Sequence, residues 1–119
     1  MKREGTKTRL IVMNGQRIIQ REEQGKWQNY QVEKAGPIRP GIYNIYLATP
    51  PEKRKTYEGM IVHADDDAVY QQVGRGFVMH VPKDLDTLPA IGGTYRIEHG
   101  ANKATVAQVS ARRPLARRI

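Results

Sequence analysis

Residues 69–81 read VYQQVGRGFVMHV, two short segments rich in β-branched and aromatic residues on either side of Gly74-Arg75-Gly76. Valine, tyrosine and phenylalanine favour extended backbone, and glycine accepts the positive φ angles of a tight turn. The stretch therefore predicts a β-hairpin with strands at Val69 to Val73 and Phe77 to Val81.

Alternation of side chains along the predicted strands indicates which of their faces are buried. In the second strand of the hairpin, Phe77, Met79 and Val81 share one face, and His80 falls on the other. The same pattern groups the apolar residues Tyr43, Ile45 and Leu47, and further along the chain Tyr95 and Ile97. We expect each of these strands to have one buried side.

Outward from this hairpin, turn-forming residues separate further short β-type segments. The Asn14-Gly15 pair and the Asp65-Asp66-Asp67 run predict two more hairpins, and a proline at the start of Pro82 to Leu88 predicts one short helical turn. The remaining predicted strands are at Arg9 to Met13, Arg17 to Gln20, Lys26 to Val32, Gly41 to Ala48, Tyr57 to His63, Thr94 to His99 and Ala104 to Val109.

These elements predict an all-β or β-rich protein. We expect residues 56–109 to form a small half-open barrel, SH3-like or OB-like, with five strands and one helical turn before the fourth. Residues 9–55 form an N-terminal β extension with proline-rich connectors, which either completes the barrel or stands as a subdomain. Residues 1–8 and 110–119 are basic tails.

Charge is distributed unevenly along the chain of 119 residues, whose net charge is +8. Residues 1–55 carry a balance of +7, residues 56–99 carry −4, and residues 100–119 carry +5. Attraction to polyanions is therefore expected at the two ends. The chain has no cysteine and no apolar run long enough for a membrane span or a signal peptide, so a cytoplasmic protein without membrane contact is predicted.

Three segments of the acidic middle resemble the KfrB domain family. They are YEGMIVH at 57–63, VYQQVGRG at 69–76 and PAIGGTYRI at 89–97, of which Gln-x-Val-Gly-Arg-Gly and Pro-x-Ile-Gly are the most specific. Residues 10–15 and 41–48 are similar to the segment that precedes the domain in stand-alone KfrB proteins.

The resemblance implies a role in plasmid maintenance or transfer. The family occurs on broad-host-range plasmids and as a module of plasmid mobilisation proteins. The implied role is exercised alongside the coiled-coil DNA-binding protein KfrA and its neighbour KfrC. It implies no reaction and supplies no catalytic or ligand-binding residue.

The residues that commonly carry catalysis do not form a recognisable set in this sequence. The only serine, Ser110, is distant from every histidine, and His63, His80 and His99 lack metal-ligand spacing. Three consecutive aspartates cannot converge on one cation, so Asp65 to Asp67 is expected to be a solvated turn. We predict no enzymatic activity, no metal and no cofactor.

Four groups of residues are candidates for binding. Arg75 is expected at the tip of the glycine hairpin, where its guanidinium can meet a phosphate or carboxylate. Trp27 with Lys26, and Tyr70 with Arg75, are conceivable base-stacking pairs, although aromatic residues in small barrels more often support the core. The fourth group is a basic arm that can contact phosphates or merely solubilise the chain: Arg112, Arg113, Arg117 and Arg118.

The sequence therefore favours a non-enzymatic plasmid accessory protein that binds a protein partner, KfrA-like or KfrC-like, with its basic flanks assisting nucleic-acid contact. The acidic stretch 56–99 favours this interpretation. The basic flanks favour the alternative, a direct nucleic-acid-binding module for single strands or nonspecific duplex. The oligomeric state is left open.

Overall fold

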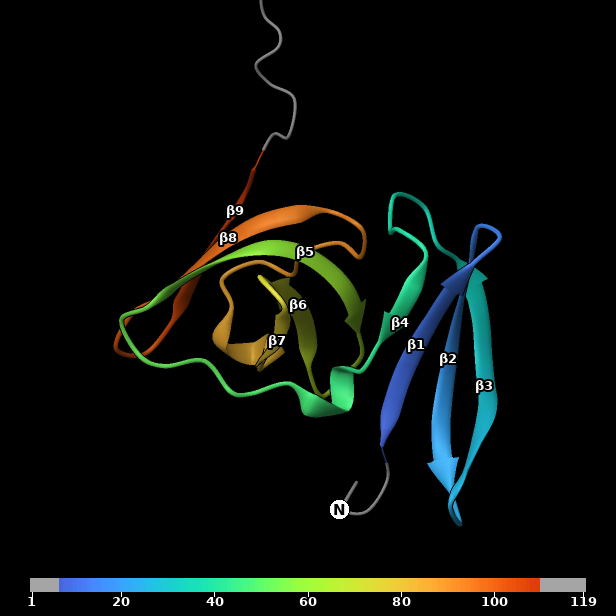
Figure 1. Cartoon of the computed structure of the whole chain (residues 1–119). Helices are drawn as coiled ribbons and strands as arrows, with labels where there is room; N and C mark the ends of the chain where they lie inside the picture. Colours follow the sequence, from blue (N-terminus) through green and yellow to red (C-terminus); the bar gives the residue numbers. More distant parts are fainter. Residues whose placement is uncertain (1–6, 110–119) are drawn as a thin grey trace, which may run out of the picture. The chain divides into compact units, whose positions relative to one another are not determined.

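The structure, a computed structural model, describes residues 7–109 (Figure 1). They form nine strands and two 3-10 helices, in two compact units that divide between Ala48 and Thr49. We call residues 7–48 the N-terminal unit and residues 49–109 the C-terminal unit. The predicted β-rich class is confirmed.

The N-terminal unit is a four-stranded antiparallel sheet. Its strands are β1 (Thr8–Met13), β2 (Gln16–Glu23), β3 (Lys26–Lys34) and β4 (Gly41–Tyr43), in the order β3-β2-β1-β4. Its buried residues include Leu10, Val12, Ile19 and Ile45.

Two-residue turns connect the first three strands. The predicted Asn14-Gly15 hairpin is confirmed, and both residues have positive φ angles, of 52° and 76°. Gln24 and Gly25 make a second such turn, with φ angles of 54° and 81°. Two positive φ angles are typical of the type I′ turn, whose twist matches that of paired strands. The second turn was not predicted, because glutamine is not among the residues that favour this conformation.

The strand predicted at Gly41 to Ala48 is wrong beyond Tyr43. The chain leaves β4 and forms the 3-10 helix η1 (Ile45–Leu47), in which the Leu47 N–H donates to the Asn44 carbonyl. Successive side chains in a 3-10 helix are about 120° apart, so residues two apart no longer share a face. Ile45 is therefore buried while Leu47 is 63% exposed.

The C-terminal unit is a five-stranded antiparallel sheet with the order β7-β6-β5-β8-β9. A 3-10 helix precedes the fourth strand, as predicted. The elements are β5 (Thr56–Ala64), β6 (Val69–Val73), β7 (Gly76–His80), η2 (Pro82–Asp84), β8 (Thr94–His99) and β9 (Ala104–Gln108).

This second sheet curves but does not close into a barrel. Its edge strands β7 and β9 do not pair with each other. Instead, the segment after η2 contacts β9 through an isolated bridge between Leu85 and Ala104 and through the Asp86 N–H, which donates to the Ala104 carbonyl at 3.0 Å. The half-open arrangement places this segment across one side of the sheet.

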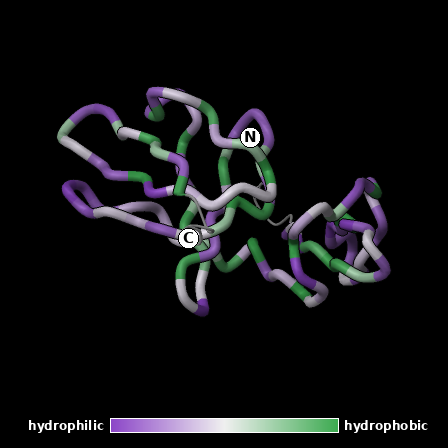
Figure 2. The backbone as a smooth tube through the Cα atoms, turned by 90° about the horizontal axis from the view of Figure 1, so that it is seen from above, coloured by the Kyte–Doolittle hydropathy of each residue, from purple (hydrophilic) through white to green (hydrophobic). Residues whose placement is uncertain are grey.

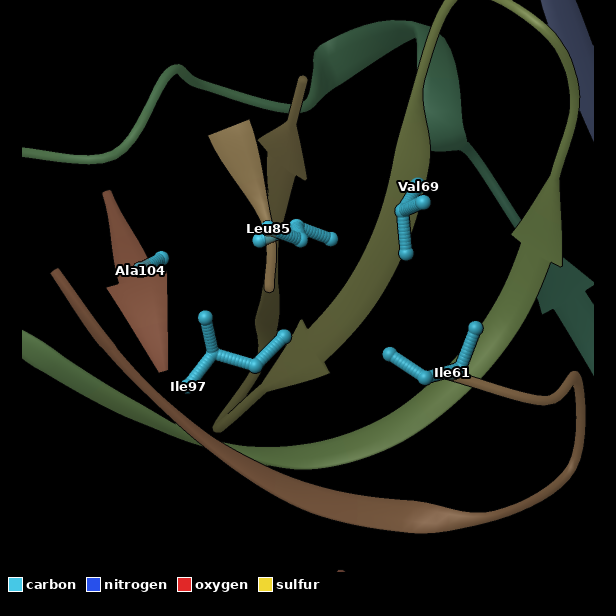
Figure 3. Close-up of a cluster of buried hydrophobic side chains, with 5 residues drawn as sticks. All are labelled: Ile61, Val69, Leu85, Ile97 and Ala104. Carbon is cyan, nitrogen blue, oxygen red and sulfur yellow. The ribbon is translucent and has the colours of Figure 1, made fainter. Parts of the chain in front are cut away.

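The core of the C-terminal unit gathers side chains from four strands and this segment (Figure 3). The side chains of this cluster are almost fully buried, and burial of a valine, leucine or isoleucine side chain contributes about 1.5–3 kcal/mol. The cluster consists of Ile61, Val69, Leu85, Ile97 and Ala104. The predicted burial of Ile97 is thus confirmed.

The buried face predicted for β7 is wrong. Alternation does occur, but Val78 and His80 are buried while Phe77 and Met79 are only partly buried. Hydropathy favoured burial of Phe77 and Met79. A histidine can nevertheless be buried when both of its ring nitrogens have hydrogen-bond partners. His80 has them.

Hydrophobic segments are short throughout the described chain. Figure 2 shows them interspersed with hydrophilic ones in both units. Within residues 7–109, no helix has the length and apolar character needed to cross a membrane.

Candidate functional site

A buried polar network links three strands of the C-terminal unit. Gln71 of β6 and His80 of β7 are completely buried, and the Gln71 Oε1 lies 2.8 Å from His80 Nε2. His80 Nδ1 lies 2.8 Å from Nε2 of His99, at the end of β8. The Tyr57 ring meets both imidazoles edge-on.

The hydrogen-bond pattern assigns the protons in this network. The Gln71 side-chain NH₂ donates to backbone carbonyls, of which that of Tyr95 is nearest at 2.9 Å, so its Oε1 must be the acceptor. His80 therefore donates from Nε2 to Gln71. A neutral His80 then accepts at Nδ1 from the Nε2–H of His99.

Burial also disfavours a charge on these histidines. It lowers the pKa of His80 to about 4, with a smaller contribution from the neighbouring His99. Burial likewise lowers the pKa of His99, although Asp84 opposes that shift. The pair is therefore neutral near pH 7.

Unfolding should become easier as the pH falls from 6.5 toward 4. The unfolded chain binds a proton at His80 with a pKa near 6.5, whereas the folded chain does so only at about 4, so acid favours the unfolded state. We expect the contribution of His80 to the free energy of unfolding to fall by about 2 kcal/mol between pH 7.5 and 4.5. Urea denaturation at both values measures this. Equal or greater stability at pH 4.5 contradicts the assignment.

The structure brings together two of the three histidines that lack metal-ligand spacing in the sequence, His80 and His99. The third, His63, stacks instead on Tyr70, with ring centroids 6.0 Å apart. Among residues 7–109, no group of three or more His, Asp or Glu side chains is placed to hold a metal ion.

A groove of about 640 Å³ opens on the surface of the C-terminal unit, between the β5–β6 turn and the segment that follows β7. Two of its apolar side chains are exposed, Val81 at 38% and Leu88 at 70%. Its lining consists of Asp66, Asp67, Val81, Pro82, Lys83, Leu85, Asp86, Thr87 and Leu88. We call it the η2 groove.

The charges of the η2 groove are mainly negative. Three aspartates line it against one lysine. Asp86 is held in place, because its Oδ1 accepts the Val106 N–H at 3.0 Å. The β5–β6 turn is shaped by Asp65, whose Oδ1 accepts the N–H of Asp67 and of Ala68. The predicted aspartate turn is therefore confirmed, and in addition it supplies Asp66 and Asp67 to the groove.

Apolar side chains edged by carboxylates suit a polypeptide segment that carries both apolar and basic residues. Sequence analysis did not find this site. Its only signal was the aspartate run. Alternation placed Val81 on a buried strand face, whereas it follows β7 and is 38% exposed, and Leu88 belongs to a connecting segment without a periodic pattern.

Arg75 lies where it was predicted, exposed at the tip of the β6–β7 hairpin. Gly74 has a φ of 60° and supplies the turn, whereas Gly76 is not among the residues with positive φ. Tyr70 does not join Arg75 as a stacking platform. Its side chain is only 7% exposed and packs on His63, so the structural alternative holds for this residue.

Trp27 lies on β3, within a cluster of rings and cations in the N-terminal unit. The Arg9 guanidinium lies 4.2 Å from the centre of the Trp27 ring, and the Tyr46 ring centroid is 5.8 Å from that of Trp27. The Lys7 Nζ lies over the Tyr46 ring, 5.2 Å from its centre. Lys26 is exposed beside Trp27, but Arg9 is the cation that covers the ring.

The last predicted binding residues, Arg112, Arg113, Arg117 and Arg118, lie outside the described residues. The other candidates are divided between the two units, with Trp27 and Lys26 in the first and Arg75 and Tyr70 in the second.

Comparison with known families identifies the module that bears the η2 groove. Residues 56–108 match the KfrB Domain family. The chain contains a KfrB domain. The match spans all five strands of the C-terminal unit, and it confirms the resemblance noted in the sequence.

The KfrB domain is preceded by a further region of similarity to a known protein. Over 109 residues, which cover 89% of this chain and 74% of the relative, the sequence is 28% identical to Protein TraB of Escherichia coli. This similarity extends beyond the KfrB domain into the N-terminal unit. Together with the KfrB match, this similarity points to a plasmid-associated protein.

Proposed function

We propose that this chain is a non-enzymatic plasmid accessory protein that acts in plasmid maintenance or transfer by binding a protein partner in the η2 groove of its KfrB domain. The observation that carries the proposal is the groove itself, where Val81 and Leu88 expose apolar surface beside three aspartates. The partner segment is apolar and basic, and KfrA-like or KfrC-like plasmid proteins are the candidates.

The chemistry of the domain supports binding rather than turnover. The chain has no cysteine, and its only serine lies outside the described residues. His80, the most buried histidine, has both ring nitrogens engaged by Gln71 and His99. A general base needs a nitrogen within reach of substrate, which His80 does not offer. This binding takes place in the cytoplasm and needs no cofactor.

Direct nucleic-acid binding is the second candidate, and the aromatic cluster of the N-terminal unit favours it. Trp27 and Tyr46 lie beside Arg9 and Lys7, and rings next to cations are the usual means of holding single strands. Tyr46 is 37% exposed. In the favoured account, these cations and the basic tails assist contact with nucleic acid that the protein partner already holds.

Capture from a plasmid-bearing host tests which candidate is correct. The tagged full chain and a form lacking residues 111–119 are each used as bait, with and without nuclease. We expect the same partner in all four experiments, because the η2 groove is retained. Loss of capture on nuclease treatment and on deletion of the tail contradicts protein recognition.

Deletion of residues 111–119 should also change any affinity for DNA in a specific way. Removing up to four arginine–phosphate contacts lowers the slope of log affinity against log salt by about 3 to 4 units on duplex DNA. Fluorescence anisotropy of labelled duplex at several salt concentrations measures the slope. An unchanged slope shows that the tail makes no phosphate contacts.

A further inference from the structure

Strand β3 is a long and exposed edge of the N-terminal sheet. It spans nine residues, pairs only with β2, and is exposed at every position except the half-buried Trp27. An edge strand presents unpaired backbone N–H and C=O groups on its outer side, which another strand can join.

Unlike β3, the edge strands β7 and β9 of the other sheet are each contacted by a neighbouring segment. Thr49 donates to the Phe77 carbonyl of β7 and accepts from the Met79 N–H, at 3.0 and 2.8 Å. Asp86 contacts β9 in a similar way, through the Ala104 carbonyl. Among residues 7–109, no isolated bridge covers β3. Its outer edge is therefore open to a partner strand.

A β-bulge sets which side chains of β3 share a face. Gln31 pairs with Ile19, and Asn29 pairs with the next residue, Gln20, so Tyr30 is an extra residue in the strand. Cross-strand partners lie on the same face of a sheet. One face of β3 therefore carries Lys26, Gln28, Gln31 and Glu33, and the other carries Trp27, Asn29, Val32 and Lys34.

This arrangement makes β3 complementary to itself. Consider two copies of β3 that run antiparallel, related by a two-fold axis between Asn29 and Tyr30. Residues of the two copies that lie opposite each other then point to the same face of the joined sheet. Lys26 of each copy meets Glu33 of the other, Trp27 meets Val32, and Gln28 meets Gln31. Without the bulge these partners would fall on opposite faces. Opposite charges and aromatic–β-branched pairs are both favourable across strands.

We propose that two copies of the chain pair through β3 and form one continuous eight-stranded sheet. The occupant of the open edge is a second copy because the charge and apolar matches are reciprocal, which a two-fold interface requires. This inference goes beyond the proposed function and does not depend on the η2 groove.

An apolar row across the sheet supports the pairing. Val32 is paired with Ile18, Ile18 with Ile11, and Ile11 with Ile42. Val32 is 51% exposed at the β3 end of this row. In the pair, Trp27 of the second copy extends the row and covers Val32.

Sedimentation equilibrium of the purified full chain tests the inference. We expect a reversible dimer for the natural sequence and a monomer for Val32→Lys, because a lysine there displaces the contact with Trp27 and charges the edge. The matched control is Ile42→Lys, which alters the same row at the opposite edge and should remain dimeric. A monomeric natural sequence, or equal disruption by both variants, overturns the proposal.

A charge reversal gives a second test that does not alter the apolar row. Lys26→Glu replaces two Lys–Glu pairs by two Glu–Glu pairs and should raise the dimer dissociation constant about ten-fold or more. Lys34→Glu makes the same charge change at the other end of β3, where it meets Gly25 of the second copy and should have little effect. Equal weakening by both variants shows that net charge, rather than this register, governs association. Since purified protein suffices, the result is independent of partner capture.

Discussion

Replacing Gly59 by alanine should prevent the KfrB domain from folding stably. A Cβ atom at this position of β5 would lie 1.7 Å from the carbonyl oxygen of Gln72 and 2.9 Å from its carbonyl carbon. Both are backbone atoms of the neighbouring strand, so relief requires β5 and β6 to separate. We expect a loss of more than about 3 kcal/mol in the free energy of unfolding, measured by urea denaturation.

Gly76→Ala is the matched control for this effect. It replaces glycine by alanine in the same sheet, but no heavy atom lies within 4 Å of the added Cβ. Its φ is not among the positive ones either. The change should alter stability by less than about 0.5 kcal/mol. Similar losses for the two variants would show that glycine content, rather than the close approach of two strands, limits this fold.

Gln71→Leu should cause the second large loss of stability. Leucine keeps much of the volume of the side chain but removes the Oε1 that accepts from the buried His80. It also removes the donor to the Tyr95 carbonyl. A buried polar group that loses its partner costs about 1–3 kcal/mol, so we expect a loss of about 3 kcal/mol or more in total.

Gln72→Leu provides the comparison for Gln71→Leu. Gln72 is the next residue of β6 and is only partly buried. Its replacement should leave the free energy of unfolding within about 0.5 kcal/mol of the natural value. If Gln71→Leu proves as mild, His80 must satisfy its ring nitrogens elsewhere and the proton assignment is incorrect.

Much of this fold follows from local sequence patterns. Turn-forming residues correctly predicted the positions of hairpins, at Asn14-Gly15 and at Gly74-Arg75, and a proline predicted the position of η2. Predictions based on alternation alone were less secure. After Tyr43 the strand gives way to a 3-10 helix, and in β7 a buried histidine replaces the apolar face that hydropathy indicated. Alternation shows that two faces differ, but tertiary hydrogen bonds decide which one is buried.

The candidate site was less accessible to sequence analysis. Gln71 appeared only as part of a family motif, since a neutral amide gives no signal of its buried contacts. The η2 groove combines the aspartate turn with Leu88, which lies more than twenty residues later in the chain. Such a juxtaposition depends on how the segment after β7 crosses the sheet. Local propensities do not encode that path.

Partner capture by variants of the η2 groove shows whether this groove holds the partner. Leu88→Ser removes the most exposed apolar side chain of the groove, and Asp66→Lys reverses a charge at its rim. Leu47→Ser is the control, because Leu47 is 63% exposed on the other unit. After nuclease treatment, both groove variants should lose most of the partner captured by the natural chain, while Leu47→Ser retains it. Full capture by the groove variants would contradict the claim.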